Sequence, residues 1–321
     1  MPEAPSSSDV SSLVEGVLRG DVRALARAIS AVEDARPEAE ALLGAAYPHA
    51  GRALVIGVTG PPGAGKSTLV DRLAARLRQD GKSLGIVAVD PTSPFSGGAI
   101  LGDRIRMQAH ALDPGVFIRS MATRGHLGGL AAATGHVLTL LAASGKDVIL
   151  VETVGVGQDE VEIVGTADVS VVVLVPGLGD EVQALKAGIM EIADVFVVNK
   201  ADREGVDRVV AEIQSTLSLA GPDGAQPQIV KTVATKGEGI DELLTAIDAF
   251  RSRAQATGLA ATRRRTQLRR QFEETLAERL MQSVRSQALT EEQAERTIDR
   301  LAAREIDPFA AAGEVLRRLR L

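Results

Sequence analysis

The chain has 321 residues, of which 45% are hydrophobic, 24% charged and only 2% aromatic, and its net charge is -6. Such a composition is ordinary for a folded globular protein, and the acidic balance argues against binding nucleic acid or an anionic membrane. The absence of cysteine excludes disulfides, thiolate metal sites and cysteine nucleophiles. The N-terminus lacks a secretory pattern and the apolar runs are only strand-sized, so we expect a cytoplasmic protein with no membrane insertion.

Residues 1–49 predict an N-terminal helical extension. Asp21 stands where its side chain can cap a helix, and Leu25, Ile29 and Val32 of the following segment fall on one helical face. A short third helical piece follows in the stretch "EAEALLGAAY".

Residues 50–250 change character, because short β-branched runs alternate there with helical segments. Continuous apolar runs, unlike in-out alternation, are typical of strands that are buried on both faces of a sheet. The region therefore predicts an α/β domain with a doubly wound, mostly parallel sheet of the P-loop NTPase type. The seven candidate strands are "ALVIGV", "LGIVAV", "VFIRS", "DVILVE", "VSVVVLV", "VFVVN" and "IVKTVAT".

Residues 251–321 contain no further strand pattern and predict a C-terminal helical arm. Its first helix carries an apolar stripe at four-residue spacing, formed by Leu268, Phe272, Leu276 and Leu280. The stretch "TEEQ" at 290–293 matches a capping box, and "DPFAAA" offers an Asp cap followed by Pro in the first helical turn. Such an arm folds back on its own domain or packs against another copy of itself.

A phosphate-binding loop follows the first predicted strand. The stretch "GPPGAGKS" has the Walker A spacing, in which backbone N–H groups and a helix N-terminus face the phosphates. Lys66 is placed to reach the β- and γ-phosphates, Ser67 to ligate Mg²⁺ and Thr68 to bond the α-phosphate. The predicted nucleotide-binding residues of this loop are Gly60, Pro61, Pro62, Gly63, Ala64, Gly65, Lys66, Ser67 and Thr68.

The base is predicted to be guanine. The strand "VFVVN" leads into an N-K-x-D pattern formed by Asn199, Lys200 and Asp202. A carboxylate at 202 accepts from both N1–H and the exocyclic amine of guanine, whereas adenine offers no such pair on that edge. The later segment at Ala234, Thr235 and Lys236 is placed to give a backbone N–H to guanine O6. We therefore expect GTP and GDP as ligands.

The stretch "ETVGVGQ" predicts the γ-phosphate side of the site. Glu152 ends a strand where an acid near Mg²⁺ is needed, and Gly155 is spaced to present a backbone N–H to the γ-phosphate. Asp90 and Asp103 are further candidate ligands, so the predicted metal set is Ser67, Asp90, Asp103 and Glu152. The predicted catalytic residues are Lys66, Glu152 and Gly155. Val156 stands where a Ras-type enzyme has its water-orienting Gln, which predicts slow intrinsic hydrolysis.

Five blocks in this order closely resemble the MeaB/ArgK family, the GTPase chaperones of methylmalonyl-CoA mutase in the G3E/SIMIBI branch of P-loop GTPases. The blocks are "GVTGPPGAGKSTL", "VAVDPTSPFSGGAILGDRIRM", "ETVGVGQDE", "PGLGDEVQALKAGIMEIAD" and "NKAD". The resemblance implies a homodimer joined by the C-terminal arm. It also implies a partner, an adenosylcobalamin-dependent acyl-CoA mutase. The GTPase would gate the loading of adenosylcobalamin into this mutase and would protect or reactivate the mutase. The resemblance also assigns phosphate, magnesium and guanine roles to the residues named above, and a switch role to Gln183 and Lys186.

Two other functions remain open on the residues alone. A nucleotide-dependent kinase linked to amino-acid (lysine, arginine or ornithine) transport, an older label for the same family, needs a pocket for an acceptor and a base aimed at it. No distinct acceptor domain is evident in the sequence. A nickel-insertion GTPase of the same branch is disfavoured, because the chain has no Cys and only four His.

Overall fold

The computed structural model describes residues 7–51, 53–90, 110, 112–122, 129–153, 165–177, 189–219 and 226–318. The chain divides into two compact units, Met1–Gln267 and Leu268–Leu321. The finer division at residues 49 and 250 stays a prediction. No helix in the described ranges is long and apolar enough to cross a membrane.

The first unit is built on a sheet of seven strands, ordered β3-β2-β4-β1-β5-β6-β7, in which every neighbouring pair is parallel. This confirms the α/β class and all seven predicted runs. The strands are β1 (Leu54–Thr59), β2 (Leu84–Asp90), β3 (Val116–Ala122), β4 (Val148–Thr153), β5 (Val169–Leu174), β6 (Val195–Asn199) and β7 (Gln228–Thr232).

The last strand is shorter than its sequence pattern. β7 ends at Thr232, and Ala234–Lys236 form a 3-10 turn, η3, where the sequence pattern continues the strand. The chain reverses here because Gly237 and Gly239 both adopt positive φ, which lets Val233 form an antiparallel bridge with Glu238. The reversal places the turn beyond the sheet edge, where it can meet a ligand.

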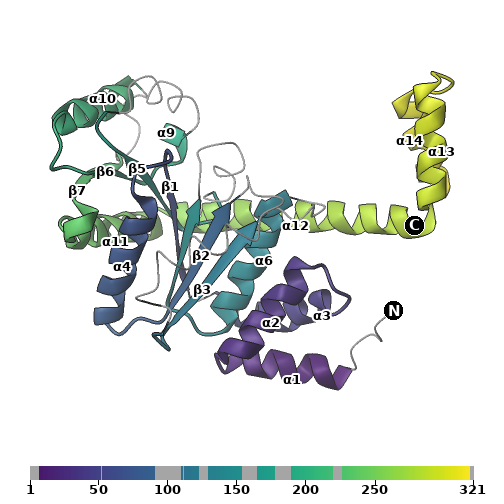
Figure 1. Cartoon of the computed structure of the whole chain (residues 1–321), viewed down its shortest axis with the longest axis horizontal. Helices are drawn as coiled ribbons and strands as arrows, with labels where there is room; N and C mark the ends of the chain where they lie inside the picture. The colour runs from purple at the N-terminus through teal and green to yellow at the C-terminus, as the bar shows by residue number, and fades with distance from the viewer. Residues whose placement is uncertain are drawn as a thin grey trace. The chain divides into compact units, whose positions relative to one another are not determined.

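Figure 1 shows the helices together with the strands of the sheet. The helices and turns are α1 (Ser7–Leu18), α2 (Val22–Glu33), α3 (Ala39–Ala46), η1 (Tyr47–His49), α4 (Lys66–Gln79), α6 (Gly129–Ala143), α9 (Ile189–Ile192), α10 (Val206–Leu219), η3 (Ala234–Lys236), α11 (Ile240–Ala256), α12 (Leu259–Gln287), α13 (Glu291–Ala302) and α14 (Pro308–Arg318).

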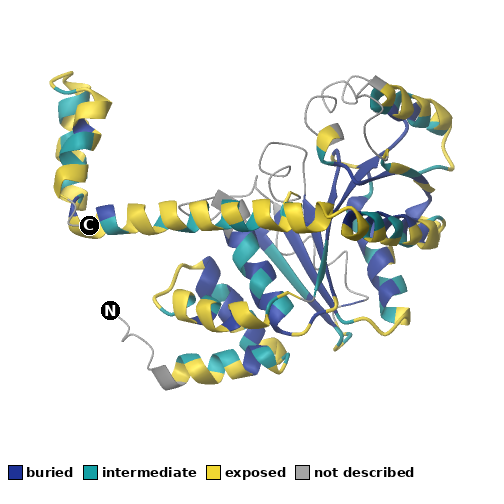
Figure 2. Ribbon diagram, turned by 180° about the vertical axis from the view of Figure 1, so that it is seen from behind, coloured by how far each residue is buried: buried dark blue, intermediate teal, exposed yellow. Residues whose placement is uncertain are grey.

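Helices cover both faces of the sheet, so β4, β5 and β6 are buried along their whole length. Figure 2 shows most of the sheet in dark blue. On one face α4 and α11 pack against residues such as Val58 and Val171. On the other, α6 and the N-terminal helices pack against β2, β3 and β4, while α10 packs against β5 and β6. Strand β1 lies where the chain turns from one half of the sheet to the other, the position where open α/β sheets bind ligands beyond their carboxyl ends.

The predicted caps are present in both units. Asp21 accepts a hydrogen bond from the Ala24 N–H at the start of α2. Thr290 and Gln293 form a reciprocal capping box on α13, and Asp307 accepts from the Phe309 and Ala310 N–H groups at the start of α14. These local signals are reliable because the groups they satisfy lie within three residues.

Candidate functional site

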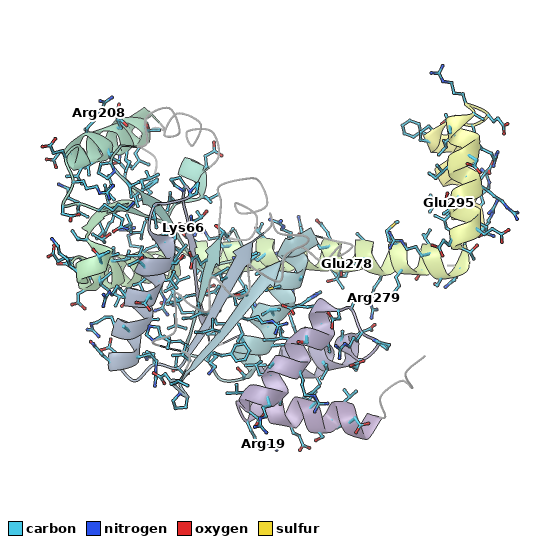
Figure 3. All side chains as sticks on the ribbon, in the orientation of Figure 1. Arg19, Lys66, Arg208, Glu278, Arg279 and Glu295 are labelled. Carbon is cyan, nitrogen blue, oxygen red and sulfur yellow. The ribbon has the colours of Figure 1, made fainter. Side chains whose placement is uncertain are left out.

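The phosphate loop connects β1 to α4 at the carboxyl edge of the sheet. Gly60 has a φ of +147°, and a Cβ at this position would lie 2.1 Å from the Val173 carbonyl oxygen, so only glycine fits. Lys66, labelled at the start of α4 in Figure 3, is 6% exposed, and its Nζ donates to the carbonyl oxygens of Gly60 (2.7 Å) and Pro61 (3.1 Å). The ammonium group is thus held within the loop that would enclose the phosphates.

The metal corner lies between the phosphate loop and β4. The Ser67 hydroxyl donates to Glu152 Oε1 at 2.5 Å, and Glu152 is only 5% exposed. The two oxygens predicted to ligate Mg²⁺ are therefore within hydrogen-bond distance of each other, and Ser67 directly follows Lys66 in the chain. Mg²⁺ binds in this way in nucleotide sites, with one or two protein oxygens and the remaining ligands from water and phosphate, so these residues fit the ion. No group of three or more His, Asp or Glu side chains gathers as a metal site within the described ranges.

A buried pair of hydroxyls fixes this corner from behind. Thr59, the last residue of β1, and Thr153, the last of β4, are both fully buried, and the Thr153 hydroxyl bonds the Thr59 hydroxyl at 2.9 Å. The pair joins the strand that enters the phosphate loop to the strand that carries Glu152. No local sequence pattern predicts this contact, because it depends on the register of the two strands.

The predicted guanine motif lies directly on the phosphate loop. Asn199 ends β6 and is 3% exposed; its Nδ2 donates to the Ala64 carbonyl oxygen at 2.8 Å. Lys200 has a φ of +56°, a conformation that a non-glycine residue rarely adopts, and its Nζ donates to the Gly63 carbonyl oxygen at 2.7 Å. Such backbone strain is typical of functional sites, where surrounding contacts hold it in place.

The turn η3 completes this side of the site. Asn199 Oδ1 accepts from the Ala234 N–H and from the Thr232 hydroxyl, at 3.1 Å each. Lys236 Nζ lies 3.8 Å from the carboxylate of Asp202, so the two segments predicted to read the base face each other. A contact that the sequence did not predict joins Arg72 of α4 to the Thr235 carbonyl oxygen at 3.1 Å.

Several predicted residues lie outside the described residues. These are Gly155, Asp103, Gln183 and Lys186. Asp90 is described only as the last residue of β2, next to β4 at the same sheet edge. The structure therefore brings together the phosphate loop, Ser67, Glu152 and the two base-side segments.

Comparison with known proteins gives consistent matches. The model of the family described as methylmalonyl-CoA mutase-associated GTPase MeaB matches residues 25–289. A Pyrococcus abyssi protein, provisionally named a GTPase, is 48% identical over 314 residues, 97% of each chain. The GTPase ArgK of Escherichia coli is 37% identical over 285 residues, 84% of this chain and 86% of that protein.

The fold matches as well. A solved structure titled as a LAO/AO transport system kinase superposes with a TM-score of 0.70 at 26% identity, and the match covers 98% of this chain and 99% of that one. The match of the family model over most of the chain, together with relatives named as GTPases, extends well beyond the phosphate loop that all P-loop proteins share. The chain belongs to the MeaB family of methylmalonyl-CoA mutase-associated GTPases.

Proposed function

We propose that this protein binds and slowly hydrolyses GTP and uses that cycle as a chaperone of a B12-dependent acyl-CoA mutase such as methylmalonyl-CoA mutase. In this role it gates adenosylcobalamin loading and protects or reactivates the mutase. The description of its family supports the mutase as partner. One observation carries the nucleotide assignment: Asn199 and Lys200 hydrogen-bond the Ala64 and Gly63 carbonyl oxygens, so the base-side motif and the phosphate loop form one site.

Different residues of the proposed site bind the phosphates, hold the metal ion and act in hydrolysis. Backbone N–H groups of Gly63 to Thr68 hold the phosphates, and Lys66 exchanges its loop carbonyls for β- and γ-phosphate oxygens. Ser67 and Glu152 would hold Mg²⁺, with Asp90 and Asp103 as further candidate ligands. When bound, the ion would neutralise charge that develops on the phosphates. Gly155 bonds the γ-phosphate, and Val156 leaves the attacking water without an orienting amide, which keeps the intrinsic rate low.

The base assignment is tested by exchanging the hydrogen-bond pattern at position 202. Asp202→Asn replaces a carboxylate oxygen by an NH₂ donor, which suits the C2 carbonyl of xanthine instead of the amine of guanine. We expect calorimetry to show GTP affinity reduced roughly 100-fold, since two charge-assisted hydrogen bonds are lost, and XTP affinity raised. The assignment is wrong if the wild-type protein holds ATP as firmly as GTP, or if the variant keeps its preference for GTP.

The partner is tested with purified mutase. We expect a cognate adenosylcobalamin-dependent mutase to co-purify with this protein in a manner that differs between GDP and a non-hydrolysable GTP analogue, and to raise GTP turnover. Switch residues Gln183 and Lys186 are proposed to respond to the partner, so Lys186→Ala should keep basal turnover and lose the stimulation. A mutase that neither binds nor changes turnover would remove the support for this role.

We further propose a cytoplasmic homodimer joined by the C-terminal arm. Large apolar side chains on the second unit are exposed, among them Phe272 (66%), Leu276 (44%) and Leu280 (42%). They share one stripe of α12, and a second copy of the arm would cover them. Contiguous apolar surface of this kind is typical of protein interfaces.

The description of the structural neighbour as a LAO/AO transport system kinase favours one other function, a kinase linked to amino-acid transport. A kinase transfers the γ-phosphoryl group to an acceptor, whereas a GTPase transfers it to water. Incubation with γ-labelled GTP and separation of the products distinguishes the two. We expect free phosphate only; label in lysine, arginine or ornithine, or in a protein acceptor, would favour the kinase.

A further inference from the structure

Two arginines of α4 hold the segment predicted to read guanine O6. Arg72 Nη2 donates to the Thr235 carbonyl oxygen at 3.1 Å, and one helical turn later Arg76 Nε donates to Asp241 Oδ1 at 2.6 Å. Thr235 lies in η3 and Asp241 in the first turn of α11. Helix α4 begins at the phosphate loop. These two contacts therefore connect the phosphate side of the predicted nucleotide site to the segment predicted to read the base.

We call Val233–Gly239, the turn that contains Thr235 and ends two residues before Asp241, the base loop. It is closed on itself by the hydrogen bond from the Val233 N–H to the Glu238 carbonyl oxygen at 3.1 Å. On its inner side, Asn199 Oδ1 accepts from the Ala234 N–H at 3.1 Å. Arg72 is the matching contact on its outer side, so the loop is held between β6 and α4.

The backbone donors of the base loop are not equivalent. The Ala234 N–H is bonded to Asn199, and the Lys236 N–H donates to the Val233 carbonyl oxygen at 2.9 Å. The Thr235 N–H makes no hydrogen bond to any residue in the described part of the chain. It is therefore a donor available to an acceptor on the base, and it belongs to the residue whose carbonyl Arg72 holds.

We propose that Arg72 is a positioning residue for base selectivity, with Arg76 in support: by fixing the Thr235 carbonyl it aims the Thr235 N–H at O6 of guanine. This rests on the proposed guanine site. Arg72 touches no nucleotide atom in this role. Because adenine carries an amine in place of O6, a well-aimed N–H at this point favours guanine and opposes adenine.

The affinities for GTP, ITP and ATP distinguish a role of Arg72 in base selectivity from a role in fold stability alone. GTP and ITP both carry O6 and N1–H, whereas ATP carries neither, and ITP lacks only the 2-amine that Asp202 would read. If Arg72 aims the Thr235 N–H, its loss weakens GTP and ITP by the same factor and leaves ATP unchanged. If Arg72 only stabilises the fold, all three nucleotides weaken together, since they share the phosphate loop.

The test is calorimetric affinity for the three nucleotides with the full-length protein and the variants Arg72→Gln, Arg72→Lys and Arg76→Gln. We expect Arg72→Gln to lower the GTP-to-ATP affinity ratio about threefold to tenfold, the effect of one hydrogen bond, with the GTP-to-ITP ratio unchanged. Arg72→Lys keeps a charged donor and should restore part of the ratio. Arg76→Gln should show a smaller effect of the same kind.

The matched control is Arg19→Gln, which removes an exposed arginine of α1 that pairs with Glu15 one turn away. Thermal unfolding of every variant confirms that the fold is kept. A GTP-to-ATP ratio within about twofold of wild type in Arg72→Gln, or an equal loss for all three nucleotides, overturns the inference. A wild-type protein without preference for GTP over ATP would instead remove the proposed function itself.

Discussion

At the scale of single residues, the phosphate loop and the guanine motif depend on each other through Gly65. This glycine has a φ of +89°, and a Cβ added to it would lie 2.4 Å from Asn199 Nδ2. The asparagine amide thus occupies the space that any side chain at position 65 would need. The absence of a side chain at Gly65 therefore leaves room for Asn199 to approach the phosphate loop, in addition to allowing the positive φ of the Walker A turn.

Gly65→Ala is therefore expected to displace Asn199 and weaken GTP binding by at least about tenfold, because the Asn199–Ala64 hydrogen bond and its neighbours are lost. Calorimetry measures the change. The matched control is Gly81→Ala: Gly81 has a φ of +76° but open space around its Cβ position. It should cost about 1 kcal/mol of stability and leave GTP affinity intact. Equal affinities of the two variants would contradict the prediction.

A second residue-scale feature is Lys146, which is only 9% exposed in the turn before β4. Burial lowers the pKa of its ammonium group below its ordinary value of 10.5, and nearby Arg78 lowers it further, while Asp113 and Asp147 act in the opposite direction. Between the folded pKa and 10.5 the unfolded chain binds more protons, so stability rises with pH in that window. Below the window the buried charge destabilises the native state by a constant amount.

Lys146→Met should therefore raise the free energy of unfolding by about 1 kcal/mol at neutral pH and remove the rise toward pH 10.5. Urea unfolding at about pH 7 and about pH 10 measures both effects. Lys82→Met, at an exposed lysine on the same edge of the sheet, is the control and should leave the pH dependence unchanged. A variant less stable than wild type at neutral pH would contradict the role assigned to burial.

At the scale of elements, the start of α12 is fixed to the base of the sheet by an ion pair between the buried Asp194 and the partly exposed Arg263. Asp194, with a side chain only 3% exposed, accepts from both terminal nitrogens of Arg263 at 2.7 Å and from the Ser170 N–H at 2.9 Å. The pairing raises the pKa of Arg263, whose guanidinium also lies 5.1 Å from the centre of the Phe250 ring. Gln267 adds a hydrogen bond to the Ala167 carbonyl oxygen at 3.0 Å.

Arg263→Met should lower the free energy of unfolding by about 3 kcal/mol, because it leaves the buried Asp194 carboxylate without its counter-charge. Chemical denaturation measures the loss. The neighbouring Arg264 is exposed, so Arg264→Met should change stability by less than about 0.5 kcal/mol. The prediction is wrong if both variants have the same midpoint.

At the scale of the whole molecule, the apolar stripe of α12 predicts the oligomeric state. Phe272→Asp combined with Leu276→Asp places two negative charges on the stripe. The double variant should be a monomer, because burying two unpaired carboxylates in an interface carries a large desolvation cost. Light scattering after gel filtration gives the mass, and circular dichroism checks that the helix is kept.

The control for this experiment is Ala277→Asp, at an exposed position of α12 one turn after Glu273 and outside the stripe of Leu268, Phe272, Leu276 and Leu280. It should remain a dimer. A wild-type protein that is monomeric at all concentrations, or a double variant that stays dimeric, would remove the proposed role of the arm. Hydrolysis by the monomeric variant then shows whether one copy completes its own site.

The sequence by itself determined the parallel strand set, the phosphate loop, the N-K-x-D motif and the caps of α2, α13 and α14, because each depends on residues close together in the chain. Only the tertiary structure decided the Gly65–Asn199 approach, the Thr59–Thr153 pair, the Arg72–Thr235 contact and the Asp194–Arg263 ion pair. Each of these joins segments more than sixty residues apart. Such contacts follow from strand register and helix packing over the whole sheet, which no local pattern encodes.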